Sequence, residues 1–215
     1  MNYIGIDPSI TSTGMCINGK LYNYCYNSSA KTKKGELTKW FKLADNYITY
    51  RYHDKVCKSD YSNEQISKME LYEYITDIII VDIKDNISKG QILIAIEGYA
   101  YSSAAGHLID LVTFSTILRQ KLLLISKNIT IIAPKSLKKL TCRGIYGSDS
   151  YDNITGGNFK KIDIYNAVSY CDSEKLDDYT NFLNKQKKDL GKLIPKPIED
   201  INDAICLYLT LTDFF

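Results

Sequence analysis

The first 26 residues constrain the fold most strongly, because they predict three short strands in immediate succession. The run YIGI before Asp7 predicts a strand that ends in a tight turn. Residues 11–17 and 20–26 predict two further strands, and Asn18-Gly19 between them is a strong two-residue hairpin signal. The chain therefore begins as an antiparallel meander.

A strand, a helix and a second strand are predicted in the middle of the chain, after a helical pattern over residues 63–88. Residues 91–97 (QILIAIE) form an apolar run of strand length, which predicts a central buried strand ending at Glu97. Residues 104–126 carry apolar side chains on one helical face, and residues 129–133 predict another buried strand. This order implies a parallel pair of strands.

The remaining segments predict helices separated by polar loops. Residues 40–52 fit a strand, a helix or both, and residues 172–197 look like a loop or an irregular insertion. We expect an α/β fold in which a mixed five-stranded sheet, with three antiparallel strands followed by parallel strands, is flanked by helices. At 215 residues the chain has the size of one domain with insertions. Helices are expected from Pro134, over residues 159–170 and over residues 199–212, with a loop-like segment at residues 144–157.

Composition excludes several classes of protein. No apolar run reaches the roughly 18 residues of a spanning helix, and the first residues lack the pattern of a signal peptide. We therefore expect a chain that is neither held in a membrane nor secreted. The six cysteines are widely scattered without a C-x-x-C pair, and the chain holds only two histidines. This spacing argues against a zinc site and favours free thiols in a reducing compartment.

The net charge of +2 conceals a strong segregation of charge along the chain. Residues 119–161 hold nine Lys or Arg against two Asp, a balance of +7, whereas residues 162–215 hold ten acids against six lysines. A basic segment of this kind predicts a polyanionic partner. A solvated helical face is the alternative interpretation.

Four acids stand where their side chains can converge. Asp7 and Glu97 end predicted strands, and ligands bind at strand ends in open sheets. Asp200 and Asp203 open the last predicted helix, where their i, i+3 spacing puts both on one face. Carboxylate oxygens without a convincing histidine or cysteine favour Mg²⁺ or Mn²⁺ over zinc. Taken singly, each acid also has an ordinary role as a turn former, a strand end or a helix-start residue.

Three stretches of sequence resemble the motifs of RuvC Holliday-junction resolvases. Residues 3–14 (YIGIDPSITSTG) resemble the opening motif, which supplies the first catalytic acid in that family. Residues 96–98 (IEG) look like the second motif, and residues 200–204 (DINDA) are similar to the closing motif on the last helix. ASKHA-type sugar kinases and chaperones also open with a glycine-aspartate strand turn, but their further phosphate-binding glycine motifs are not visible here.

The resemblance implies a ribonuclease-H-like fold and a metal-dependent endonuclease. In that reading two Mg²⁺ ions per active site, for which Mn²⁺ can substitute, are held by the four acids Asp7, Glu97, Asp200 and Asp203. Hydrolysis would leave 5′-phosphate and 3′-hydroxyl ends at paired symmetrical nicks in Holliday junctions and related branched DNA. Two symmetrical cuts imply a homodimer, and residues 104–126 are its expected interface. The resemblance implies no small-molecule cofactor.

Further residues are expected to contact DNA by the same resemblance. Lys161 is the candidate for a catalytic lysine near the scissile phosphate, with Lys160 as the alternative. Tyr99 and Tyr101 follow Glu97 and can stack on bases, or else pack in the ordinary way. The expected DNA-binding residues are Tyr99, Tyr101, Lys135, Lys138, Lys139, Arg143, Lys160 and Lys161.

The chain departs from the compact bacterial pattern in two places. Residues of about 35–90 and 172–197 exceed the family's usual links, and the richness in Ile, Lys, Asn and Tyr suggests a viral or phage-type member. Such a protein would work in the host-cell cytoplasm or in a viral replication compartment. Two other functions stay open, namely a broader structure-selective debranching or flap nuclease and a protein that binds branched DNA without cutting it.

Overall fold

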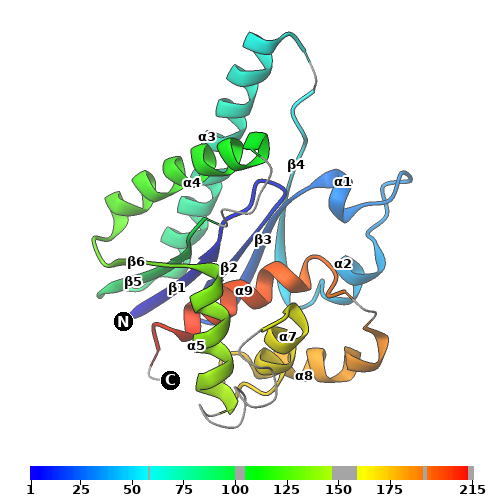
Figure 1. Cartoon of the computed structure of the whole chain (residues 1–215), viewed down its shortest axis with the longest axis vertical. Helices are drawn as coiled ribbons and strands as arrows, with labels where there is room; N and C mark the ends of the chain where they lie inside the picture. The colour runs from blue at the N-terminus through cyan, green and yellow to red at the C-terminus, as the bar shows by residue number, and fades with distance from the viewer. Residues whose placement is uncertain (58, 100–104, 147–158, 191–192, 213–215) are drawn as a thin grey trace.

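A mixed six-stranded sheet forms the centre of the computed structural model, which describes residues 1–57, 59–99, 105–146, 159–190 and 193–212 (Figure 1). The strand order is β4-β3-β2-β1-β5-β6. Strands β1 (Asn2–Asp7), β2 (Ser12–Ile17) and β3 (Lys20–Tyr26) form the antiparallel meander. Strands β5 (Ile92–Glu97) and β6 (Ile129–Ile132) continue the sheet in parallel with β1. The predicted fold class is confirmed.

The expected number of five strands was wrong, because β4 (Ile48–His53) adds a sixth strand at the β3 edge. Residues 40–52 contain both of the structures that fitted their pattern, since the helix α2 (Lys39–Leu43) precedes β4. Strand β4 runs parallel to β3, with Leu21 opposite Ile48 and Tyr26 opposite His53. The strand begins with the β-branched residues Ile48 and Thr49 and contains the aromatic residues Tyr50 and Tyr52, which are types that favour strands.

Two other expectations were wrong. Strand β6 was expected to be buried, but it lies at the sheet edge and Ile131 is 56% exposed. An edge strand has one neighbour and leaves alternate side chains in solvent. Residues 172–197 were expected to be irregular, but they form the helix α8 (Asp177–Gln186) and a turn of 3₁₀-helix, η1 (Lys187–Asp189). Tyr179, Phe182 and Leu183 are buried on one face of α8, at helical spacing within a polar sequence.

Helices cover both faces of the sheet (Figure 1). Ile4, Ile6 and Ile96 point toward α3 and α4, where they pack with Phe114 and Leu118. The other face carries α5, α7, α8 and α9. The remaining bounds are α1 (Asn27–Ala30), α3 (Tyr61–Asn86), α4 (Ala105–Ile125), α5 (Pro134–Tyr146), α7 (Lys161–Ser169) and α9 (Ile198–Leu209). Within the described ranges, no helix is both long and apolar enough to cross a membrane.

A buried carboxylate attaches α3 to the added edge of the sheet. Asp82 on α3 is buried and accepts hydrogen bonds from the Tyr24 hydroxyl at 2.9 Å and from Arg51 Nε at 3.0 Å. Arg51 also donates through a terminal nitrogen to the second carboxylate oxygen at 2.6 Å. A charged acceptor with a bidentate arginine is a strong contact in a partly dry environment. The contact ties α3, β3 and β4 together.

Five of the six strands run in the same direction, so their carboxyl ends meet at one edge of the sheet. Strand β2 runs the opposite way and begins at that edge. We call this edge of the sheet the C-terminal edge. The strands that end there finish at Asp7, Tyr26, His53, Glu97 and Ile132. Two of the predicted site acids therefore lie at this edge.

Two glycines let α9 lie directly against the sheet backbone. A Cβ atom on Gly5 would lie 2.2 Å from the Ala204 carbonyl oxygen and 2.4 Å from the Tyr208 nitrogen. A Cβ atom on Gly14 would lie 2.2 Å from the Asp200 carbonyl oxygen. All three obstacles are backbone atoms, which no change of rotamer removes. Glycine at these positions sets the depth at which α9 carries its acids.

Replacing Gly5 by Ala should therefore push α9 away from β1 and lower the free energy of unfolding by about 3 kcal/mol. Urea denaturation followed by circular dichroism measures this change. Gly98→Ala is the control, because a Cβ there would meet its nearest atom at 3.4 Å, an ordinary contact. Equal stability of Gly5→Ala and Gly98→Ala would contradict the close approach of α9.

Candidate active site

The structure brings the four predicted acids together from three segments of the chain. Asp7 and Glu97 end the adjacent strands β1 and β5, and α9 crosses that face of the sheet with Asp200 and Asp203. Asp7 and Asp200 are buried, whereas Glu97 and Asp203 are partly buried. Each acid lies close enough to another to shift its pKa. The convergence predicted from the sequence is present in the fold.

Asp7 and Glu97 share a hydrogen bond between their side chains. Burial raises the pKa of Asp7 well above its ordinary value, and the charges of Glu97 and Asp200 raise it further. Burial also raises the pKa of Glu97 to about 7, against the effect of that hydrogen bond. Two carboxyl groups this close cannot both ionise without cost. In the absence of a cation, a proton donated by Asp7 to Glu97 relieves the repulsion.

Asp200 is held from two sides by partners that the sequence did not identify. Ser12 on β2 donates its hydroxyl to Asp200 Oδ2 at 2.5 Å, and Asn23 Nδ2 donates to the Ser12 oxygen at 3.1 Å. Lys196, just before α9, forms an ion pair with Asp200 Oδ1. Burial raises the pKa of Asp200, whereas Lys196 and Ser12 act in the opposite direction. One carboxylate oxygen is fixed by the sheet, and the other faces a cation.

Asp203 lies one helical turn further along α9. Burial raises its pKa to about 7, and the charge of Asp7 adds to this effect. Lys138 and Lys161 lower it in part. The next side chains of α9, Ala204 and Ile205, are fully buried, so the helix continues into the core directly behind this acid.

Three lysines from separate elements supply positive charge around the acids. Lys161 at the start of α7 forms an ion pair with Glu199, and the charge of Lys161 reaches Glu97, Asp200 and Asp203. Lys138 on α5 lowers the pKa values of Glu97 and Asp203. Lys196 lies 4.0 Å from the second oxygen of Glu199, in addition to its pairing with Asp200.

The alternative lysine, Lys160, takes a different position. Its side chain is exposed, and its backbone nitrogen donates to Asp163 at 2.6 Å to cap α7. The charge of Lys161, in contrast, lowers the pKa values of Glu97 and Asp203. The geometry therefore favours Lys161 of the two candidates.

The other expected DNA-binding residues lie at varying distances from the acids. Tyr99 has Arg119 stacked over its ring at 4.5 Å, and Arg119 also donates to the Glu97 carbonyl oxygen at 3.3 Å. Lys135 and Lys139 are exposed on α5, and Arg143 is partly buried near its end. Tyr101 lies outside the described residues. Tyr99 therefore packs against a cation beside the site.

The donor set suits a hard divalent cation. All four acids offer carboxylate oxygen, and their raised pKa values show that the charged forms lack sufficient compensation. Across the described part of the chain, no group of three or more His, Cys, Asp or Glu side chains is arranged as a ready metal site. The carboxyl groups instead contact Ser12, Lys196 and one another. In identity the residues fit Mg²⁺ or Mn²⁺, and their present partners are a proton and lysines.

Sequence reasoning missed Ser12 and Lys196. Ser12 lies inside the opening motif, but only the fold shows that its side chain points toward α9. Lys196 precedes Asp200 by four residues, a spacing at which opposite charges pair on a helix. That spacing is a usable signal, but it falls where residues 172–197 look like a loop or an irregular insertion, and Lys196 was not predicted as a site residue.

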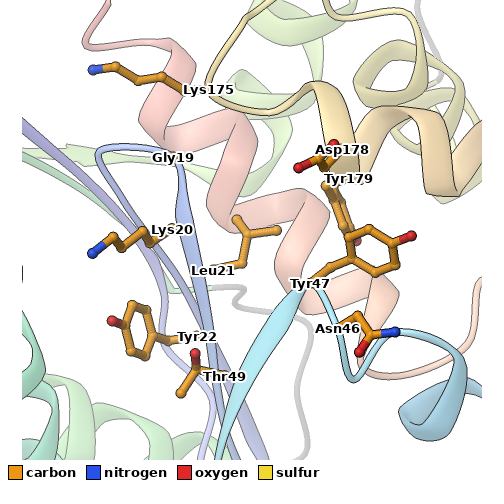
Figure 2. A pocket seen from close by; sticks show the side chains of 10 residues that line it. All are labelled: Gly19, Lys20, Leu21, Tyr22, Asn46, Tyr47, Thr49, Lys175, Asp178 and Tyr179. Atoms are coloured by element: carbon orange, nitrogen blue, oxygen red, sulfur yellow. The ribbon is translucent and has the colours of Figure 1, made fainter.

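A separate hollow of about 270 Å³ lies at the other end of β3 (Figure 2). Figure 2 shows Lys20 and Lys175 on one side and Tyr47, Asp178 and Tyr179 on the other. Its wall includes the β2–β3 turn, opposite the C-terminal edge, and none of the predicted site residues. The acids therefore do not lie in this hollow.

Comparisons with known proteins find similar solved structures but no matching family model. No family model matches the chain, and no curated protein matches it. It is similar to the Thermus thermophilus RuvC structure, with 15% identity and a TM-score of 0.49. It is also similar to T. thermophilus RuvC in complex with Holliday junction substrate, with 14% identity and a TM-score of 0.47. Each comparison covers 98% of this chain and 92% of the other. At these values the likeness carries no argument about activity.

Metal-free stability should fall as the pH rises, because folding raises the pKa values of Glu97 and Asp203 from 4.5 and 3.8 to about 7. The folded chain holds protons that the unfolded chain releases. This contribution is complete below about pH 4 and is lost as the pH rises through about 7. We expect Asp203→Asn to flatten the dependence by on the order of 2 kcal/mol between about pH 5 and pH 8, measured by urea denaturation in EDTA.

Asp85→Asn is the matched control for this measurement, because Asp85 is exposed near the end of α3. The free energy of unfolding of this variant should change with pH in the same way as that of the parent chain. If the free energy of unfolding of Asp203→Asn depended on pH in the same way as that of the parent chain, folding would not raise the pKa of Asp203.

Proposed function

We propose that this chain is a divalent-metal-dependent endonuclease that resolves Holliday junctions and related branched DNA. The observation that carries the proposal is the meeting of four carboxyl groups from β1, β5 and α9 at one sheet edge, with three lysines around them. Buried acids that repel one another destabilise a fold unless they serve a cation. The resemblance of the three acid-bearing motifs to RuvC resolvases points to the same activity.

Asp7, Glu97, Asp200 and Asp203 would hold the metal ions. When bound, divalent ions activate a water molecule and stabilise the leaving oxygen of a phosphodiester. Ser12 keeps one oxygen of Asp200 in place, and the other, which pairs with Lys196 in this structure, would be available to a metal ion. Lys161 and Lys138 would hold the phosphate by charge, because both already act electrostatically on the acids.

Paired cuts at a four-way junction require two such sites. We infer a two-fold homodimer, in which each copy supplies one acid cluster. The outer surface of α4 is the proposed interface, because Ile109 and Leu124 are exposed there at 66% and 87%. Apolar side chains of this size on a helix surface favour contact with another chain.

Cleavage of a labelled four-way junction in Mg²⁺ should be abolished by EDTA and reduced more than about 100-fold by Asp7→Asn. Asparagine keeps the shape of the side chain but removes a charge that the cation needs. Denaturing gel electrophoresis measures cleavage, and a mobility shift measures binding, which Asp7→Asn should retain. Asp85→Asn, an exposed acid on α3, is the matched control and should cut like the parent chain.

Flap and plain duplex substrates separate the alternatives. Paired symmetrical nicks confined to the junction would support the resolvase, whereas cutting of all branched substrates would indicate a broader debranching nuclease. Binding of the junction without metal-dependent cutting of any substrate would contradict the enzyme and leave a DNA-binding protein.

Ser12→Ala should weaken Mn²⁺ binding on the order of tenfold, because Asp200 loses the donor that fixes its orientation. Isothermal titration calorimetry with Mn²⁺ measures the change without substrate. Ser9→Ala is the control, since the Ser9 hydroxyl contacts only the exposed Thr11 hydroxyl among the described residues. Unchanged Mn²⁺ affinity in Ser12→Ala would show that Asp200 needs no such support.

A further inference from the structure

Residues 31–37 form an ordered hairpin, which we call the lysine hairpin. Lys31 and Leu37 pair as an antiparallel bridge, and the Thr32 nitrogen donates to the Glu36 carbonyl at 2.7 Å. Gly35 closes the turn with φ +82° and donates to the Thr32 carbonyl at 2.9 Å. Figure 1 shows this segment after α1, projecting from the body of the molecule. Its backbone holds the tip in a defined shape.

The lysine hairpin begins a second basic segment that the charge balance of the whole chain conceals. Residues 31–42 contain five lysines and one glutamate, which gives a balance of +4 over twelve residues. Lys33 and Lys34 are exposed at the tip. Lys31 at its base lies with its ammonium 4.5 Å from the centre of the Tyr52 ring on β4. This contact holds the base of the hairpin against the edge strand.

Topology places this segment on the opposite side of the acids from the first basic segment. The lysine hairpin follows β3 through α1, and α5 follows β6, so both leave the sheet at its C-terminal edge. In the strand order, β1 and β5 lie between β3 and β6. Four strand spacings separate β3 from β6, about 19 Å in total. The acid cluster therefore stands between two separate groups of cations.

We propose that the lysine hairpin binds the phosphate backbone of a DNA arm other than the one whose phosphate lies at the acids. Lysine contacts with phosphate need no base sequence and act through charge. The acids on β1 and β5 lie within this span, so phosphates on the two sides of the acids would meet separate groups of lysines. Arms that diverge from a branch point place phosphates on both sides. The inference rests on the proposed function, because it takes branched DNA as the ligand.

The test compares Lys33→Gln/Lys34→Gln with the parent chain by fluorescence anisotropy in EDTA, which prevents cutting. A four-way junction should bind on the order of tenfold more weakly, and the slope of log affinity against log salt should fall by about 1.8. A duplex of about 10 bp, which has no second arm, should bind the variant and the parent chain with the same affinity. Lys84→Gln/Lys89→Gln is the matched control, because both lysines are exposed and Lys89 lies just before β5, at the opposite edge.

Each outcome separates the hairpin from the nuclease. Selective weakening of junction binding supports the second contact. Unchanged junction binding, or equal weakening on the junction and on a linear duplex of matched total length, overturns it. Both of those results leave metal-dependent cutting by the parent chain unaffected. If the parent chain bound no branched DNA, the proposed function and this inference would both be wrong.

Discussion

The contact between the backbone of α9 and the backbones of β1 and β2 controls the rest of the site. Gly5 and Gly14 remove the Cβ atoms that would otherwise hold the helix away from the sheet. Strand β1 turns Ile4 and Ile6 to the opposite face, where they fill the core with α3 and α4. Successive side chains of a strand point to opposite faces of the sheet, so β1 packs isoleucines against α3 and α4 on one face and leaves room for α9 at Gly5 on the other. Because α9 lies this deep, its acids meet those at the strand ends.

That approach creates an electrostatic problem which the chain solves with its own groups. Burial raises the pKa values of all four carboxyl groups, and the charges of neighbouring acids raise those of Asp7, Glu97 and Asp203 further. Lys196, Lys161 and the Ser12 hydroxyl compensate part of the charge, and a shared proton between Asp7 and Glu97 compensates more. Carboxyl groups whose pKa values are shifted this far cluster at functional sites.

Most of the fold followed from local patterns, whereas the contacts of the site did not. The hairpin at Asn18-Gly19 and the run ending at Glu97 specify their strands through turn chemistry and continuous apolarity. The helix α8 was missed because Tyr179, Phe182 and Leu183 are few among polar residues. The pattern of residues 40–52 allowed β4 without fixing it, because that segment fits a strand and a helix equally well. The order of the acids along the chain was visible, but Ser12 beside Asp200 is a contact across 188 positions that no local pattern records.

The parallel pairing of β4 with β3 makes the long segment between β3 and β5 part of the sheet. The chain leaves β3, returns to run beside it as β4, and then continues through α3 on the other face of the sheet. Asp82 closes this path by bonding to Tyr24 and Arg51. A shortened chain without residues 35–90 would expose the ladder edge of β3, and it would remove both the acceptor of the Tyr24 hydroxyl and the helix that packs over this face of the sheet. The segment is thus a structural part of the sheet and of the core, because it supplies the edge strand β4 and the helix α3.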